Sequence, residues 1–230
     1  YMPFGKLFIN SLFDNVDFDS INKIFIYDTG LSENSKAYLN LYPRVEIRET
    51  EYNTKGAKMH DEDWQKNVYS KTSFLLKNIK ETKNPTIMID SDSLFLSDFF
   101  DLIDNKVDFI ACKRSRDGFS KHIGSFFVVN NVVAAPEFLQ TWIREIKHGE
   151  TAPDAPTSKE SPALSRTIEK MERLTKVGEL PEDQISYFSY EGAQPHNDVR
   201  IMHLKSDFGR ETIEKRINQP HIVDYVKKYL

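Results

Sequence analysis

Hydrophobic positions recur along the chain with two spacings, which together predict alternating helices and strands. Apolar residues three or four positions apart are typical of amphipathic helices, whereas short apolar or β-branched runs between turn-forming residues are typical of strands. The expected helices cover residues 3–16, 32–41, 64–82, 99–103, 136–147 and 164–174, with a short helix from 180 and a terminal one. The expected strands cover residues 23–27, 45–51, 86–89, 107–112, 124–129 and 199–204. This order predicts an α/β fold with a mostly parallel, mixed central sheet and helices on both of its faces.

The most informative stretch leads from a buried strand into two carboxylates. Four apolar or β-branched residues, Thr86–Ile89, run directly into Asp90-Ser91-Asp92. Side chains two residues apart on an extended chain point to the same side, so we expect Asp90 and Asp92 to face together. Ligands of parallel α/β sheets bind at the carboxyl ends of the strands, which is where this pair would lie.

Two neighbouring carboxylates favour a bound cation. At ~4 Å, two like charges repel by about 4 kcal/mol at an effective dielectric constant near 20. Hard divalent ions such as Mg²⁺ or Mn²⁺ take carboxylate oxygens and often share the rest of their coordination shell with substrate phosphates. The pair therefore predicts a metal–diphosphate site. The alternative is a strand-ending turn and helix cap, which is a common use of Asp and Ser.

The composition is that of one globular domain covering residues 1–230. The net charge of −4 argues against a general nucleic-acid binder. The single cysteine, Cys112, excludes an internal disulfide, follows an apolar run, and is expected to be a buried thiol in a reducing compartment. No apolar stretch approaches the ~20 residues of a transmembrane helix. We therefore expect a cytoplasmic protein. Because the chain begins at Tyr1, we also expect that its amino terminus is incomplete. Membrane association through segments outside this sequence stays open.

Taken in order, several short motifs resemble the glycosyltransferases of the GT-A fold, most closely the family-8-like nucleotide-sugar transferases. The resemblance extends over about residues 1–210. The motifs are Tyr27-Asp28-Thr29-Gly30-Leu31-Ser32, the helix with Lys71, Ile89-Asp90-Ser91-Asp92-Ser93, Gly124-Ser125-Phe126-Phe127-Val128-Val129-Asn130, Glu182-Asp183-Gln184 and Met202-His203-Leu204-Lys205. The resemblance implies an enzyme that moves a sugar from a nucleotide-diphosphate donor, with a UDP-sugar as the first choice, to a hydroxyl group of a glycan, lipid or protein acceptor.

The resemblance also implies a role for the carboxylate pair. In that fold an Asp-x-Asp motif binds a divalent metal, usually Mn²⁺ and otherwise Mg²⁺, which holds the donor diphosphate. Asp92 would be the more direct ligand, Asp90 would reach the ribose or the metal, and His203 would complete the metal shell. The metal would act as a Lewis acid on the departing nucleotide diphosphate, where negative charge develops. Without the resemblance, a histidine on a strand is more often a core residue than a ligand.

Further contacts with the donor follow from the same resemblance. Lys71 and Lys205 would add positive charge near the phosphates, and Ser91 would lie beside the nucleotide. Gly124-Ser125 would lie near the donor sugar, although Ile123 replaces the asparagine or aspartate that is usual there.

The segment Glu182-Asp183-Gln184 is compatible with two mechanisms. In inverting GT-A enzymes, an acidic residue here removes the proton of the acceptor hydroxyl as a general base. In the retaining family-8-like enzymes, an aspartate–glutamine pair lies near the anomeric carbon instead. Gln184 favours the retaining mechanism, whereas Glu182 beside Asp183 leaves the inverting one open. An acidic helix start with no catalytic role is the third interpretation.

The chain departs from the family at its beginning. The nucleotide-binding strand that precedes the first helix of the GT-A fold is not in this sequence, so we expect either that it lies upstream of Tyr1 or that the domain binds its nucleotide with a reduced sheet. The choice among UDP, GDP and CDP therefore stays open. Acceptor contacts usually lie on loops, and residues 113–121 and 149–162 are the loops considered for them. The histidines other than His203 are expected mainly in loops, without metal-binding spacing: His60, His122, His148, His196 and His221.

Two other classes of protein remain as alternatives. A haloacid-dehalogenase-type phosphatase also places two aspartates after an apolar strand, and Asp90 would then be the nucleophile. However, Leu94 stands where that class has Thr or Val. A transferase-like domain that only binds sugar or a partner protein is the non-enzymatic alternative.

Overall fold

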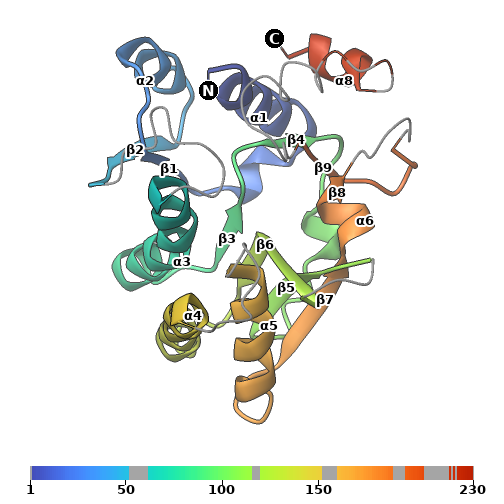
Figure 1. Cartoon of the computed structure of the whole chain (residues 1–230). Helices are drawn as coiled ribbons and strands as arrows, with labels where there is room; N and C mark the ends of the chain where they lie inside the picture. Colours follow the sequence, from blue (N-terminus) through green and yellow to red (C-terminus); the bar gives the residue numbers. More distant parts are fainter. Residues whose placement is uncertain are drawn as a thin grey trace. The chain divides into compact units, whose positions relative to one another are not determined.

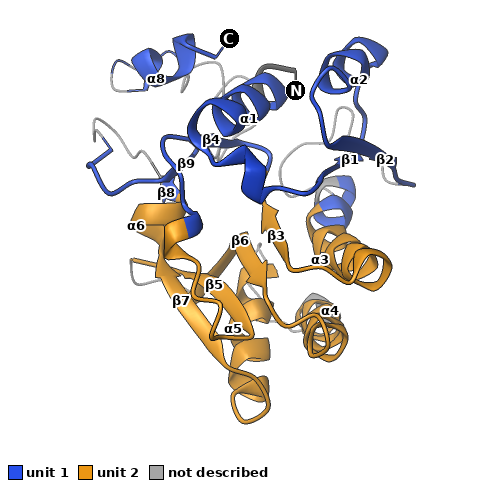
Figure 2. Ribbon diagram, turned by 180° about the vertical axis from the view of Figure 1, so that it is seen from behind, with its two compact units in different colours: residues 1–67, 91–100, 187–230 blue, residues 68–90, 101–186 orange. Residues whose placement is uncertain are grey.

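The computed structural model of the chain describes residues 2–51, 62–115, 120–151, 160–188, 195–204, 218, 220 and 222–229. The chain divides into two compact units, which Figure 2 shows in different colours. Unit 1 consists of residues 1–67, 91–100 and 187–230, and unit 2 consists of residues 68–90 and 101–186. Each unit is therefore assembled from segments that are far apart in the sequence.

Helices and strands are interspersed along the chain (Figure 1). The α-helices are α1 (Met2–Asn15), α2 (Glu33–Leu39), α3 (Glu62–Thr82), α4 (Ala135–Thr151), α5 (Glu160–Met171), α6 (Glu182–Ile185) and α8 (Val223–Lys227). The 3-10 helices are η1 (Phe18–Ser20) and η2 (Phe100–Leu102). The strands are β1 (Ile24–Asp28), β2 (Val45–Glu49), β3 (Thr86–Ile89), β4 (Ser93–Phe95), β5 (Phe109–Lys113), β6 (His122–Val129), β7 (Val177–Pro181), β8 (Tyr187–Phe188) and β9 (Ile201–His203). Every expected helix and strand is present, with η2 in place of the helix expected at 99–103.

Unit 2 is built on a four-stranded sheet with the order β3-β6-β5-β7. Strand β6 is antiparallel to both β3 and β5, whereas β5 is parallel to β7. The prediction of an α/β fold with a mixed sheet is confirmed, but the expectation of mostly parallel pairing is wrong for this sheet. The connection from β5 to β6, residues 114–121, is too short for the crossover of a dozen or more residues that a parallel pair needs.

The core of unit 2 lies between this sheet and helices α3, α4 and α5 (Figure 1). All residues of β6 are buried. The rings of Phe109, Phe127 and Phe138 stack with centroid separations from 4.2 to 5.9 Å, and Trp142 packs beside Phe127. Burying one such ring stabilises the fold by about 1.5–3 kcal/mol, so this cluster holds β6 firmly against the three helices.

Unit 1 contains two smaller sheets. In the first, β1 and β2 are parallel, and α2 lies between them in the sequence. In the second, β9 is antiparallel to β4 and parallel to β8. Helix α1 packs against β4, where Leu7, Leu94 and Met202 are fully buried. The hydroxyl of Ser11 on α1 accepts a hydrogen bond from the backbone N–H of Phe95, at 3.0 Å.

The hydrophobic pattern missed three strands. Strands β4 and β8 are too short for an alternation of two residues to be recognised. Strand β7 contains Gly178, Glu179 and Pro181, residue types that are uncommon in strands. Its place at the edge of the four-stranded sheet accommodates Pro181, because an edge strand leaves one row of backbone groups outside the ladder.

Two boundaries of α5 differ from expectation. Leu174 was expected on the helix but lies beyond its end at Met171 and is 68% exposed, because the chain turns there. Residues 160–162 were expected in a loop but begin the helix, since an acidic residue and a proline both suit a first turn. Residues 152–159 lie outside the described part of the chain.

The histidines are less confined to loops than expected. His122 begins β6 and is buried, and His148 lies in the last turn of α4, because both elements extend beyond the bounds expected from their apolar residues. His196 does lie in a loop, whereas His60 and His221 fall outside the described residues. Cys112 is buried as expected. Across the described ranges, no helix has both the length and the apolar character needed to cross a membrane.

Candidate metal centre

The two aspartates lie in a turn between β3 and β4. Strand β3 ends at Ile89, Ser91 and Asp92 form the turn, and β4 begins at Ser93. The backbone N–H of Asp90 donates to the carbonyl of Ser125 at 3.0 Å, which extends the β3–β6 ladder by one bond. The expectation of a continuous extended chain is therefore wrong at Ser91, since the chain bends instead of continuing β3.

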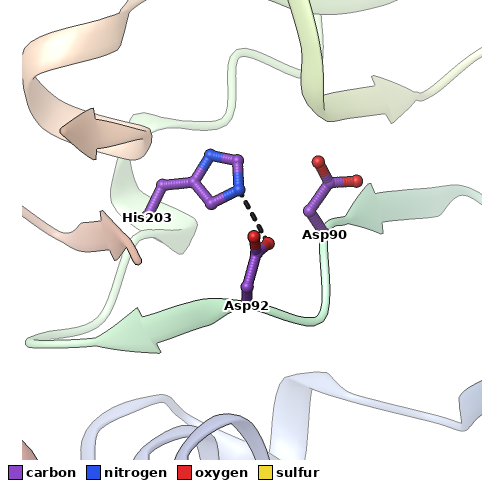
Figure 3. Close-up of side chains that lie close together, drawn as sticks. All are labelled: Asp90, Asp92 and His203. Atoms are coloured by element: carbon purple, nitrogen blue, oxygen red, sulfur yellow. Dashed lines mark hydrogen bonds and ion pairs between the residues drawn. The ribbon is translucent and has the colours of Figure 1, made fainter. Parts of the chain in front are cut away.

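The turn nevertheless gathers three groups that can hold a metal ion. Asp90, Asp92 and His203 each offer one ligand atom, and these atoms lie within 4.8 Å of one another (Figure 3). The two carboxylates are close because only Ser91 separates them in the chain. His203 is aligned with Ser93 in the β4–β9 ladder, so strand pairing brings its ring beside Asp92.

The contact between His203 and Asp92 is short and largely buried. Nε2 of His203 lies 2.7 Å from Oδ1 of Asp92, and the exposed fractions of the two side chains are 3% and 32%. The backbone carbonyl of Asp92 also accepts a hydrogen bond from the N–H of Leu204, at 2.8 Å. Asp92 and His203 are thus held together both through their side chains and through the backbone that follows β9.

The donor set fits a divalent ion. Two carboxylates and one imidazole suit Mn²⁺, and carboxylates with water suit Mg²⁺. The present contact needs a proton on Nε2 of His203 to donate to Asp92, and a metal bound by that nitrogen would replace this proton. The three side chains therefore offer the ligand types that one divalent ion needs.

Lys71 lies between two carboxylates of unit 2. Its ammonium group is 2.7 Å from Oδ1 of Asp90 and 3.1 Å from Oε1 of Glu160. It also donates to the carbonyl of Gly124 at 3.4 Å. Burial by itself would lower the pKa of Lys71, but the charges of Asp90 and Glu160 outweigh burial and raise the pKa above its usual value. The lysine is therefore a fixed cation that is paired with carboxylates.

Gly124 and Ser125 face the start of α5 and the end of α6. The N–H of Gly124 donates to the hydroxyl of Ser161 at 3.2 Å. The hydroxyl of Ser125 is buried and lies 2.7 Å from that of Ser186. Both residues thus make contacts inside unit 2, and the predicted contact with a donor sugar stays a prediction.

The segment from Glu182 to Gln184 forms most of the short helix α6. Glu182 is buried, and its Oε2 accepts a hydrogen bond from the N–H of Ser115 at 3.0 Å. Asp183 is exposed and Gln184 is half-buried. The metal-ligand group found among the described residues does not include this segment. Glu182 therefore anchors the loop after β5, and Asp183 is the exposed carboxylate of the segment.

The sequence pattern did not indicate Glu160 as a residue of the site, and Lys205 lies outside the described residues. Glu160 falls in a segment that is expected to be a loop, yet it contacts Lys71. The available signal was Gly124, since a glycine within an apolar strand often marks a close approach of another group. The expected contact of Lys205 with the phosphates therefore stays a prediction.

No family model matches the chain, and no curated protein matches it.

Proposed function

We propose that the chain is a metal-dependent glycosyltransferase. It would move a sugar from a nucleotide-diphosphate donor, with a UDP-sugar as the first choice, to a hydroxyl group of a glycan, lipid or protein. The observation that carries the proposal is the group formed by Asp90, Asp92 and His203, whose ligand atoms lie within 4.8 Å of one another. The motif order that resembles GT-A glycosyltransferases supplies the reaction class.

The residues around the turn would each make a different contact in the complex with metal and donor. Asp92 and His203 would provide one carboxylate and one imidazole ligand, and Asp90 a second carboxylate. A bound Mn²⁺ or Mg²⁺ would supply Lewis acidity at the diphosphate. Lys71 would hold Asp90 in place, because its ammonium group already contacts that carboxylate.

The candidate residues for activating the acceptor hydroxyl, or for contacting the anomeric carbon, lie on α6. Asp183, being exposed, is the residue that we assign as general base if the reaction inverts the anomeric centre. If the reaction retains the configuration, Gln184 with Asp183 would instead lie near the anomeric carbon. Glu182 is buried and already accepts a hydrogen bond from Ser115, so we rank it after Asp183 and Gln184 as a candidate catalytic residue.

The test is calorimetric titration of the full chain with UDP-, GDP- and CDP-sugars, with and without Mn²⁺. We expect binding of one nucleotide class that depends on Mn²⁺ and is abolished by Asp92→Asn. Asp63→Asn, a change of the same kind at an exposed position of α3, should leave binding unchanged. Absence of metal-dependent binding by the folded wild-type chain would refute the proposal, and a phosphoenzyme formed on Asp90 would identify a phosphatase.

A further inference from the structure

Glu160 is a buried carboxylate beside the proposed metal centre. It is the first residue of α5, and 5% of its side chain is exposed. An ionised carboxylate is costly to bury unless a cation compensates it. Lys71 is one such cation, at 3.1 Å, and the same ammonium group contacts Asp90 at 2.7 Å.

The surroundings of Glu160 fix its position from several sides. The indole N–H of Trp142, a fully buried residue of α4, donates to the backbone carbonyl of Glu160 at 3.1 Å. The next residue, Ser161, accepts a hydrogen bond from the N–H of Gly124. Gly124 also leaves room for the carboxylate, because a β-carbon at that position would lie 2.6 Å from Cδ of Glu160. The backbone and side chain of Glu160 are therefore both in contact with core residues of unit 2.

The charges in this group have a clear consequence for Asp90. Lys71 and Asp90 alone would form a neutral pair, and a neutral pair attracts a divalent cation weakly. The additional carboxylate of Glu160 leaves the three residues with a net charge of about −1. One ammonium group can then orient Asp90 without cancelling the negative charge that Asp90 offers to a metal.

We propose that Glu160 is a positioning residue of the metal centre, which shares the ammonium group of Lys71 with Asp90 and so preserves the negative charge of an oriented Asp90. This inference rests on the metal centre of the proposed function. It assigns the effect to Glu160 acting through Lys71, not to direct coordination of the ion.

The experiment measures Mn²⁺ binding to the full chain without nucleotide, using the electron paramagnetic resonance signal of free Mn²⁺. We expect Glu160→Gln to weaken binding about tenfold, the lower end of the range for residues that support metal ligands. The matched control is Glu145→Gln. Glu145 is also buried and paired with two cations, Arg166 and Lys170, so its replacement should cost stability yet leave the dissociation constant for Mn²⁺ unchanged.

A second variant keeps the test decisive if Glu160→Gln folds poorly. The double variant Lys71→Met/Glu160→Gln removes both partners and leaves no uncompensated ammonium group beside Asp90. We expect it to bind Mn²⁺ more tightly than Glu160→Gln and about as tightly as the wild-type chain, because Asp90 and its two neighbours keep the same net charge in both. If Glu160→Gln does not fold, binding by the folded double variant about tenfold weaker than by the wild type would refute the role of Glu160.

The outcomes separate the two proposals. If the wild-type chain binds no Mn²⁺, the metal centre itself is wrong and the role of Glu160 falls with it. If the wild-type chain binds Mn²⁺ and Glu160→Gln binds it equally well, the metal centre stands and the role of Glu160 is refuted. Equal weakening by Glu160→Gln and Glu145→Gln would also refute that role, since the effect would then be one of general stability.

Discussion

Gly124 lies where a side chain would collide with the carboxylate of Glu160. A β-carbon built on its backbone would be 2.6 Å from Cδ and 2.8 Å from each carboxylate oxygen of Glu160. The colliding atoms are the end of a flexible side chain, so they can move aside. Their movement would, however, take the carboxylate away from Lys71. A buried charge that loses its partner destabilises the folded state.

We therefore predict that Gly124→Ala lowers the free energy of unfolding by about 1–2 kcal/mol, as measured by urea denaturation. The same substitution at Gly5 is the control, because no heavy atom lies within 4 Å of a β-carbon built there. Gly5 is within α1, so Gly5→Ala should increase stability by about 0.5–1 kcal/mol. Equal effects at the two positions would contradict the close packing of Glu160 against Gly124.

Glu179 gives a prediction for the dependence of stability on pH. Its carboxylate lies within 2.7–3.0 Å of Lys113, Lys121 and His122. Burial alone would raise the pKa of Glu179, but these three contacts outweigh it and lower the pKa from 4.5 to about 2. A lowered pKa in the folded state means that the stabilisation is fully present above pH 4.5 and is lost as the pH falls towards 2.

We expect Glu179→Gln to reduce the free energy of unfolding by about 2 kcal/mol at pH 7, allowing for solvent screening of the two exposed lysines. The difference from the wild type should shrink steadily in denaturation curves recorded below pH 4.5. Glu169→Gln, at an exposed position of α5, should change stability little at either pH. A difference at Glu179 that stays constant down to pH 3 would show that charge is not its cause.

Among individual residues, those with a strong local signal could be predicted from the sequence. Asp90 and Asp92, separated only by Ser91, follow an apolar strand, and His203 followed from motif order. The structure brings these three within reach of one ion. Glu160 was missed because its partner Lys71 is far away in the sequence, and the two meet only through the packing of α3 and α5 in the core of unit 2.

At the scale of single elements, the end of α3 is strained. Lys83, directly after the helix, has φ = 55°, a left-handed conformation that favours glycine over residues with a β-carbon. Its N–H donates to the carbonyl of Ile79 at 2.9 Å, which closes the last turn. Pro85 follows two residues later and prevents the helix from continuing.

Lys83→Gly should therefore increase the free energy of unfolding by about 0.5–1 kcal/mol. Lys80→Gly makes the identical change three residues earlier, at an exposed position with helical geometry, and should decrease stability by about 1 kcal/mol. Thermal or chemical denaturation of the two variants checks the opposite signs. Destabilisation by both substitutions would refute the strain at Lys83.

Elements with a clear hydrophobic period were predictable, and short or polar ones were not. The face of α3 that includes Leu75 and Ile79 is buried in the core of unit 2 as its spacing indicated. Strand β7 was missed because its place in the sheet comes from pairing with β5, which overrides the weak strand preference of Gly178 and Pro181.

For the whole molecule, the order of helices and strands was sufficient to predict an α/β fold with a mixed sheet. The direction of the strand pairs was harder to predict, since it depends on which distant segments meet. Strand β4 pairs with β9, more than a hundred residues further along the chain. Local periodicity carries no information about such a pair. The three-stranded sheet β4-β9-β8 of unit 1 could therefore not be anticipated, nor could the interruption of unit 1 by the segments of unit 2.

This interrupted arrangement has a consequence for the time at which each part can fold on the ribosome. All segments of unit 2 have been synthesised at residue 186, whereas β4 has no strand partner until residues 201–203 follow. At a synthesis rate of about 5–20 residues per second, Leu94 and Phe95 wait roughly 5–20 s for β9. Helix α1 precedes them and packs against β4, so it can cover these side chains during the delay. Polar substitutions on that face of α1 should therefore reduce the yield of newly made protein through aggregation, in addition to any effect on the finished fold.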